Sequence, residues 1–150
     1  MKNSCVEISV LGERNYRLFL DVVRCELDLL RIVDINAVQA FILLNIGGNV
    51  ITAGDVIAKG YYIGSNASYN IRKMVTNGYV KQMQSDYDKR ATFLKLTDDG
   101  LSLCSKLNQA IDEHVAEFAP GTKGKFDLGQ CALILKKIEH FWKDLLSRKQ

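Results

Sequence analysis

A polar helical segment and the short basic turn after it carry the residue types that read nucleic acids. Segment 65–77 has an apolar face, with Ala67, Ile71 and Met74 at helical spacing, and an opposite polar face. Arginine can bond to guanine, asparagine to adenine, and serine or tyrosine to a phosphate. The residues expected to contact DNA are Ser65, Asn66, Ser68, Tyr69, Arg72, Lys73, Lys89 and Arg90.

Positive charge gathers around this segment. Residues 59–95 contain seven Lys or Arg and two Asp, which gives a local net charge of +5. Residues 97–119 contain five acidic residues and one lysine, which gives −4. A basic block beside an acidic one is typical of a protein that binds a polyanion. The charge distribution therefore favours double-stranded DNA as a partner.

Apolar periodicity and turn residues predict the elements that would hold these side chains. We expect a loose arm at 1–12 and helices near 13–32, 34–46, 52–60, 65–77, 97–119 and 127–148. Asp34 is the expected cap of the second helix, and Thr52 with Asp55 of the third. Residues 79–84 and 91–96 have strand character around the polar turn 85–90.

These elements define an expected fold class that is mainly α with a small β-hairpin wing. We expect one domain over 1–150, with a winged helix-turn-helix at 34–96 and dimerisation helices at 13–32 and 98–148. The long helices carry apolar stripes that a small winged domain could not cover, and such surfaces usually meet a partner. A twofold homodimer is the commonest solution, and it suits a near-palindromic operator.

The cysteines have two expected roles. Cys104 and Cys131 lie on apolar stripes, so we expect both thiols to be buried. Cys25, next to an arginine, and Cys5, in the expected arm, are the candidates for redox sensing.

Other chemistry has little support in this sequence. The chain has no C-x-x-C pair, no catalytic or phosphate-cradling motif, and no second ligand at metal spacing near either histidine. We therefore expect no enzymatic activity, no metal and no cofactor. The chain also lacks a signal-peptide pattern and any apolar run near the roughly 18 residues that span a membrane, so we expect a cytoplasmic protein.

The region around the turn resembles the MarR (multiple-antibiotic-resistance regulator) family. The similarity is sharpest in NASYNIRKMVTNGYVKQMQSDYDKRATFLKLTDDG, and it rests on three motifs in order: Gly78-Tyr79-Val80, Asp88-Lys89-Arg90 and Leu96-Thr97-Asp98-Asp99-Gly100. The resemblance implies that Arg90 reaches the minor groove or its phosphates and that Asp88 supports the wing. It also implies a homodimeric repressor or activator. Small aromatic ligands often release such a regulator from DNA, and in one branch of the family cysteine oxidation releases it.

An effector would be expected between the dimer helices and the winged domain. Residues near that junction are Tyr16, Phe19, Leu20 and Phe41, which are equally good core residues. Two other functions stay open at this point. One is a winged-helix module that binds proteins and no DNA, and the other is a thiol-based redox-sensing regulator.

Overall fold

The chain folds into helices with one small sheet. The structure, a computed structural model, describes residues 2–60, 64–84, 92–121 and 127–149. It divides into two compact units, Met1–Asp112 and Glu113–Gln150, with the boundary inside the fifth helix. The elements are α1 (Lys2–Leu29), α2 (Ala37–Ile46), β1 (Ile51–Thr52), α3 (Ala53–Gly60), α4 (Gly64–Thr76), β2 (Val80–Gln84), β3 (Thr92–Leu96), α5 (Asp98–Gly121) and α6 (Leu128–Ser147).

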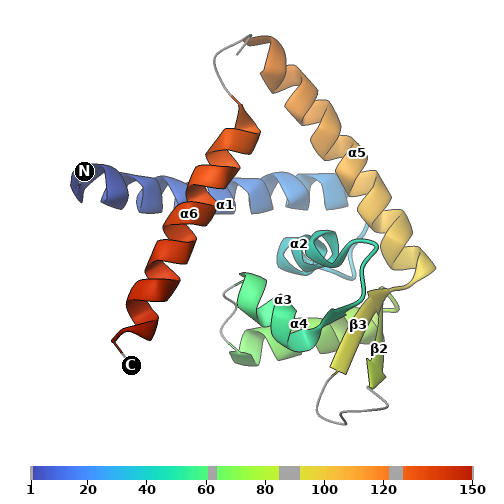
Figure 1. The fold of residues 1–150 in the computed structure, drawn as a ribbon. Helices are drawn as coiled ribbons and strands as arrows, with labels where there is room; N and C mark the ends of the chain where they lie inside the picture. The colour runs from blue at the N-terminus through green and yellow to red at the C-terminus, as the bar shows by residue number, and fades with distance from the viewer. Residues whose placement is uncertain (1, 61–63, 85–91, 122–126, 150) are drawn as a thin grey trace. The chain divides into compact units, whose positions relative to one another are not determined.

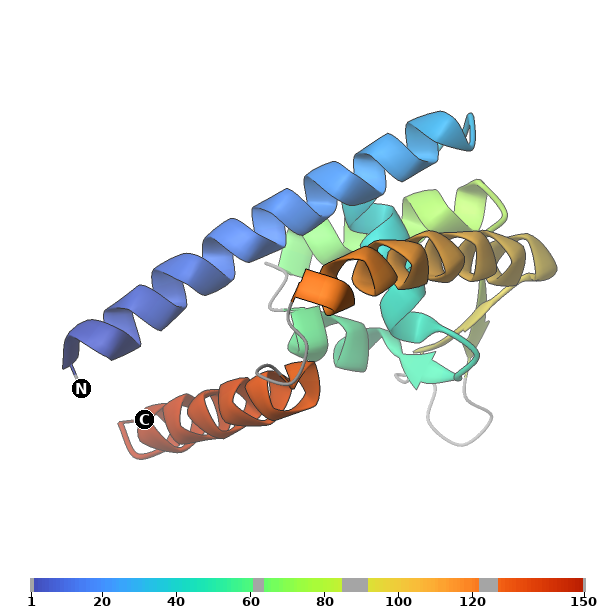
Figure 2. The same ribbon diagram turned by 90° about the horizontal axis from the view of Figure 1, so that it is seen from above.

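Helix α1 is longer than the sequence pattern indicated. The expected loose arm at 1–12 was wrong, because the helix begins at Lys2 and runs without interruption to Leu29 (Figure 2). Residues 2–11 contain neither Pro nor Gly, so nothing in them breaks a helix. The helix ends before 32, where Arg31 adopts a left-handed backbone with φ of 56°.

The caps of α2 and α3 are reciprocal pairs of hydrogen bonds. For α2 the expected cap, Asp34, was wrong, because Asn36 occupies that position. The Asn36 side chain accepts from the Gln39 amide at 2.9 Å, and the Gln39 side chain accepts from the Asn36 amide at 3.0 Å. The same reciprocal pair forms between Thr52 and Asp55 at the start of α3, as predicted.

The three strands form one antiparallel sheet in the order β1-β3-β2. The hairpin register pairs Val80 with Leu96 at one end and Gln84 with Thr92 at the other. Both expected strands are therefore confirmed, and the turn 85–90 lies outside the described residues.

The first unit is built around one apolar core. Helices α2, α3 and α4 lie beside the sheet (Figure 1). Helix α2 has an almost wholly apolar sequence and is the most buried element, while α4 and β3 each contribute one face. Fully buried side chains of this core are Val23, Ile42, Leu43, Ile46, Met74, Val80, Leu94 and Leu107.

The second unit contains α6, which begins at Leu128 with Asp127 as its cap, close to the predicted start of the last helix. No residue of α6 is buried in the single chain. The expected burial of Cys131 was therefore wrong, because its thiol is exposed on a helix whose apolar side chains are uncovered in this chain. Among the described residues, no helix combines the length and apolarity that crossing a bilayer would need.

Gly100 lies in close contact with the backbone of Tyr79. A Cβ at this position would lie 2.2 Å from the Tyr79 carbonyl oxygen and 3.2 Å from the Leu96 Cβ. The contact holds the first turn of α5 against the start of β2, so the position requires a glycine.

We expect Gly100→Ala to lower the free energy of unfolding by about 1–3 kcal/mol, because the new methyl group overpacks this contact. Urea unfolding measures the change. Gly54→Ala is the matched control, since its new Cβ would meet only the Thr52 hydroxyl at an ordinary 3.6 Å. Equal stability of the two variants would contradict the close approach.

Candidate nucleic-acid interface

Helix α4 has one buried face and one exposed face. Ala67, Ile71 and Met74 point into the core, each less than 5% exposed, as the apolar spacing predicted. The opposite face presents five of the residues expected to contact DNA, all exposed: Asn66, Ser68, Tyr69, Arg72 and Lys73. Ser65 belongs to α4, and its side chain lies outside the described residues. The exposed face is thus rich in donors and lacks acidic groups.

The wing residues singled out from the sequence, Asp88, Lys89 and Arg90, lie outside the described residues. The described base of the hairpin adds two cations that the site prediction omitted. Lys81 and Lys95 are exposed and stand directly opposite each other across β2 and β3. Like charges in such a pair disfavour the isolated sheet and favour a bound anion. Only the strand register reveals this pair, because the two lysines are far apart in sequence.

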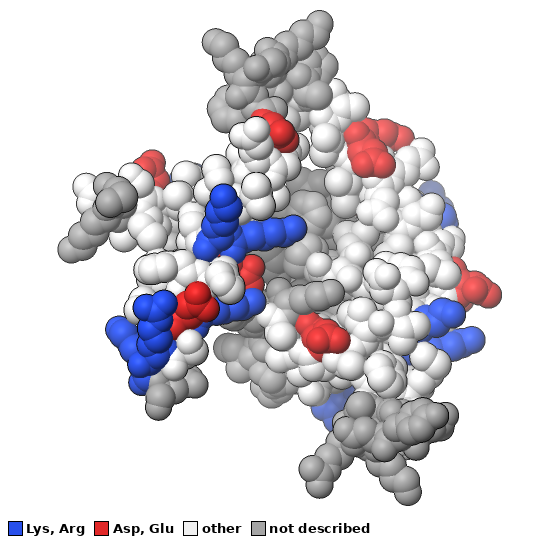
Figure 3. All heavy atoms as spheres, in the orientation of Figure 1, with Lys and Arg blue, Asp and Glu red and all other residues white. Residues whose placement is uncertain are grey.

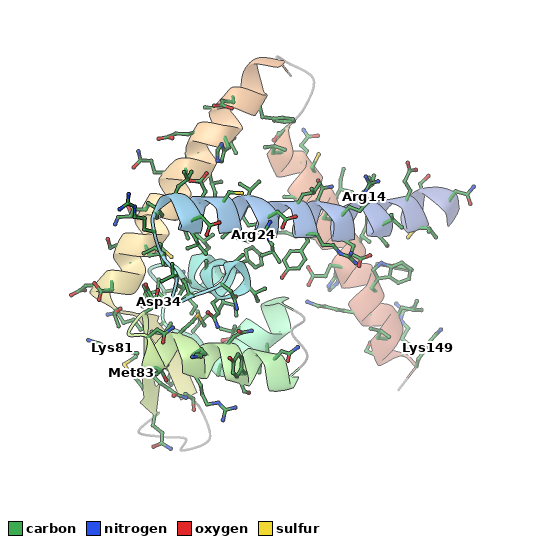
Figure 4. The ribbon with its side chains drawn as sticks, turned by 180° about the vertical axis from the view of Figure 1, so that it is seen from behind. Arg14, Arg24, Asp34, Lys81, Met83 and Lys149 are labelled. Atoms are coloured by element: carbon green, nitrogen blue, oxygen red, sulfur yellow. The ribbon has the colours of Figure 1, made fainter. Side chains whose placement is uncertain are left out.

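The end of α4 is tied to three other segments. Gly78 takes a left-handed backbone with φ of 83°, which turns the chain from α4 into β2. The Thr97 hydroxyl donates to the Gly78 carbonyl at 2.6 Å, and the Thr97 amide donates to the Tyr79 carbonyl at 3.0 Å. The Asn77 amide side chain donates to the backbone carbonyl of Asp34. Asp34 lies in the segment after α1 (Figure 4).

Tyr79 strengthens this junction from inside. Its hydroxyl donates to the Asp34 carboxylate at 3.0 Å, and its ring is 9% exposed. Burial, then the hydrogen bond and charge of Asp34 and the charge of Asp99, raise the pKa of Tyr79 to about 12. The phenol therefore stays protonated at neutral pH and keeps its role as a donor.

The residues expected at an effector site fill a junction between α1 and α2. The rings of Tyr16 and Phe19 each contact Phe41 edge-on, with centroids 5.6 Å apart. Leu20 is half-buried on the same helix. These rings pack against one another at the edge of the core, where Tyr16 stays exposed and Phe19 and Phe41 are half-buried. A cavity of about 320 Å³ lies elsewhere, lined by Ile32, Asp34, Asn77, Tyr79, Asp99, Ser102, Leu103 and Lys106.

The cysteines differ in their surroundings. Cys104 is buried, as predicted, and burial raises the pKa of its thiol to about 11, so it stays a thiol at neutral pH. Cys25 is exposed, and Cys5 is half-buried within α1 rather than in a loose arm. Within the described part of the chain, no three His, Cys, Asp or Glu side chains gather closely enough to hold a metal ion.

Charge on the visible face of the molecule is not segregated. Figure 3 shows acidic and basic side chains in small groups of both signs, separated by uncharged surface.

Three comparisons with known proteins bear on this fold and site. A family model described as a winged helix DNA-binding domain matches residues 35–100, the segment from α2 to the start of α5. The exopolysaccharide II synthesis transcriptional activator ExpG of Rhizobium meliloti (strain 1021) is 31% identical over 136 residues, which cover 91% of this chain and 70% of that protein.

Solved structures share the fold at lower identity. A mutant MarR from E. coli complexed with operator DNA is 19% identical with a TM-score of 0.66, and the match covers 91% of this chain and 96% of the other. AbsC, a MarR family transcriptional regulator from Streptomyces coelicolor, is 20% identical with a TM-score of 0.70 over 94% of each chain.

The fold and the matched segment define a DNA-binding transcription regulator of the winged-helix class. The chain belongs to the MarR family of these regulators, as the three sequence motifs implied. The family acts in transcription regulation and not in catalysis, which agrees with the expectation from the sequence.

Proposed function

We propose that this chain is a homodimeric regulator that reads a near-palindromic operator with α4. The observation that carries the proposal is the two-faced character of α4. Its apolar face is locked in the core, and its donor-rich face is fully available to solvent. A helix of this kind, followed by a hairpin, fits the major groove with its exposed face while the hairpin meets the neighbouring backbone.

The side chains divide by what they can recognise. Arg72 and Asn66 have the fork-like donors and acceptors that distinguish guanine and adenine in the major groove. Ser65, Ser68, Tyr69 and Lys73 suit phosphates, which position a protein without specifying sequence. We assign Lys89 and Arg90 to the backbone or minor groove beside the wing, with Asp88 holding the wing, and add Lys81 and Lys95 as phosphate contacts at its base.

The solved E. coli MarR complex supports this assignment, because a protein of the same fold holds operator DNA. ExpG supports a role in transcription, since it is an activator. We infer a cytoplasmic protein, where the DNA of such a regulator would be.

We also propose that α1, α5 and α6 form the dimer interface. The exposed apolar side chains of these helices are numerous, and those of α6 alone include Leu133, Ile134, Leu135, Phe141 and Trp142. Such a surface is large for a monomer. A second copy would cover it and would set two α4 helices about one duplex turn apart.

A small aromatic effector is proposed for the junction of Tyr16, Phe19, Leu20 and Phe41, and thiol control for Cys25 or Cys5. Binding of an effector there requires the aromatic rings to separate. A saturating concentration of a benzoate-type acid that left the DNA affinity unchanged would count against this effector site. Thiol control requires that peroxide change DNA affinity and that Cys25→Ser or Cys5→Ser abolish the change.

The two DNA-contacting elements should respond differently to truncation. Arg72→Ala should weaken binding to the operator by about 1–3 kcal/mol and relax preference at one base position. Arg90→Ala should weaken binding to every duplex more evenly and reduce the salt slope by about one phosphate per subunit. Salt titrations of the selected operator and a random duplex measure both effects.

Arg24→Ala is the matched control for these variants. Arg24 is an exposed arginine on α1 that pairs with Asp21 on the same helix, so its loss removes the same charge far along the chain from α4. It should leave affinity and salt slope nearly unchanged. If Arg72→Ala behaved like Arg24→Ala, α4 would not be the reading helix.

Deleting residues 122–150 should give a monomeric or aggregating chain with weak DNA binding, because the apolar partner surface of α6 is lost. Light scattering with DNA titration measures both properties. Deleting only 148–150 removes the end of the chain beyond α6 and should preserve the dimer. A well-behaved dimer of the longer truncation would refute the proposed interface.

A further inference from the structure

A hydrogen bond between two buried amides links α2 to α4. The Gln39 side chain donates from Nε2 to the Asn70 Oδ1 at 3.2 Å. Gln39 is 4% exposed and Asn70 is 8% exposed, and they are the buried polar residues of the described core. Asn70 lies on the buried face of α4, one residue before Ile71. The bond therefore reaches the proposed reading helix from its hidden side.

Gln39 has little freedom to make any other contact. Its Oε1 accepts from the Asn36 amide, and its own backbone amide donates to the Asn36 side chain. The capping box of α2 thus holds one end of the Gln39 carboxamide and directs the other end at Asn70. A buried donor in such a position loses much if its acceptor moves.

The other buried side chains on this face of α4 are apolar. Apolar burial is non-directional, so Ala67, Ile71 and Met74 fix the rotation of the helix less sharply than a hydrogen bond does. A hydrogen bond is directional and loses strength within a few tenths of an ångström. A second polar link, from Asn77 to the Asp34 carbonyl, holds the end of the same helix. Both links start in the short segment 34–39.

We propose that Gln39 is a positioning residue that sets the rotation of α4 and hence its choice of base sequence. The proposal rests on the proposed function of α4. With side chains extending about 5–6 Å from the helix axis, a rotation of about 10° moves their ends by about 1 Å. Such a shift is enough to break a bidentate contact from Arg72 to a base, while phosphate contacts from long side chains would adjust.

The test separates positioning from stability. A duplex selected by the wild-type chain from a random library serves as the probe, with a random duplex beside it. Gln39→Met and Asn70→Leu each leave one buried amide unpaired and should lower stability. The double variant replaces both partners by apolar groups of similar shape. It should recover the stability that an unpaired amide costs, while the capping bond from the Asn36 amide to Gln39 stays lost. Its preference for the selected duplex should nevertheless fall about tenfold, with affinity for the random duplex nearly unchanged.

Val23→Ala is the control for stability alone. It trims a buried side chain of α1 in the same core and should keep the wild-type preference. A double variant that kept the full preference for the selected duplex would overturn the positioning role, as would an equal loss on both duplexes. If the wild-type chain showed no preference for the selected duplex over the random one, the proposed function would be contradicted, and this inference would fall with it.

Discussion

The burial of one face of α4 is the constraint on which the rest of the structure depends. Met74 and Ala67 are completely covered, and this turns the opposite face of the helix, with Tyr69, Arg72 and Lys73, to the surface. The elements that contact α4 and supply this cover are α2, α3 and the sheet. A short polar helix such as α4 would not be ordered without a core to pack against.

The need to hold α4 in place also explains the glycines and hydrogen bonds where the hairpin begins and ends. The chain must leave α4, turn sharply and start β2 while the first turn of α5 lies almost in contact. Gly78 supplies the left-handed turn, Gly100 permits the close approach, and Thr97 ties the two together. Tyr79 and Asp34 then connect this junction to the end of α1.

Local chemistry explains which parts of this architecture the sequence could predict. The spacing of Ala67, Ile71 and Met74, the Thr52–Asp55 box and the turn at Gly78 are encoded within a few residues. The corrected features have non-local or competing causes. Asp34 and Asn36 are both good caps, and Tyr79, distant in sequence, takes Asp34 as its acceptor. Residues 2–11 have a composition compatible with a helix but no clear apolar stripe. Periodicity places Cys131 on an apolar helix face, but it does not show whether another part of the protein covers that face. The Gln39–Asn70 pair joins residues 31 positions apart, which no local pattern reveals.

The central claim is that the exposed face of α4 enters the major groove, and photo-crosslinking tests it most directly. A photoreactive residue would replace Arg72 in one full-length chain and Arg24 in another, each bound to the duplex selected by the wild type. The account predicts crosslinks from position 72 to a small set of bases, repeated in the two halves of the site, and none above background from position 24. Equal crosslinking from both positions, or crosslinks from position 72 spread evenly over the duplex, would contradict it.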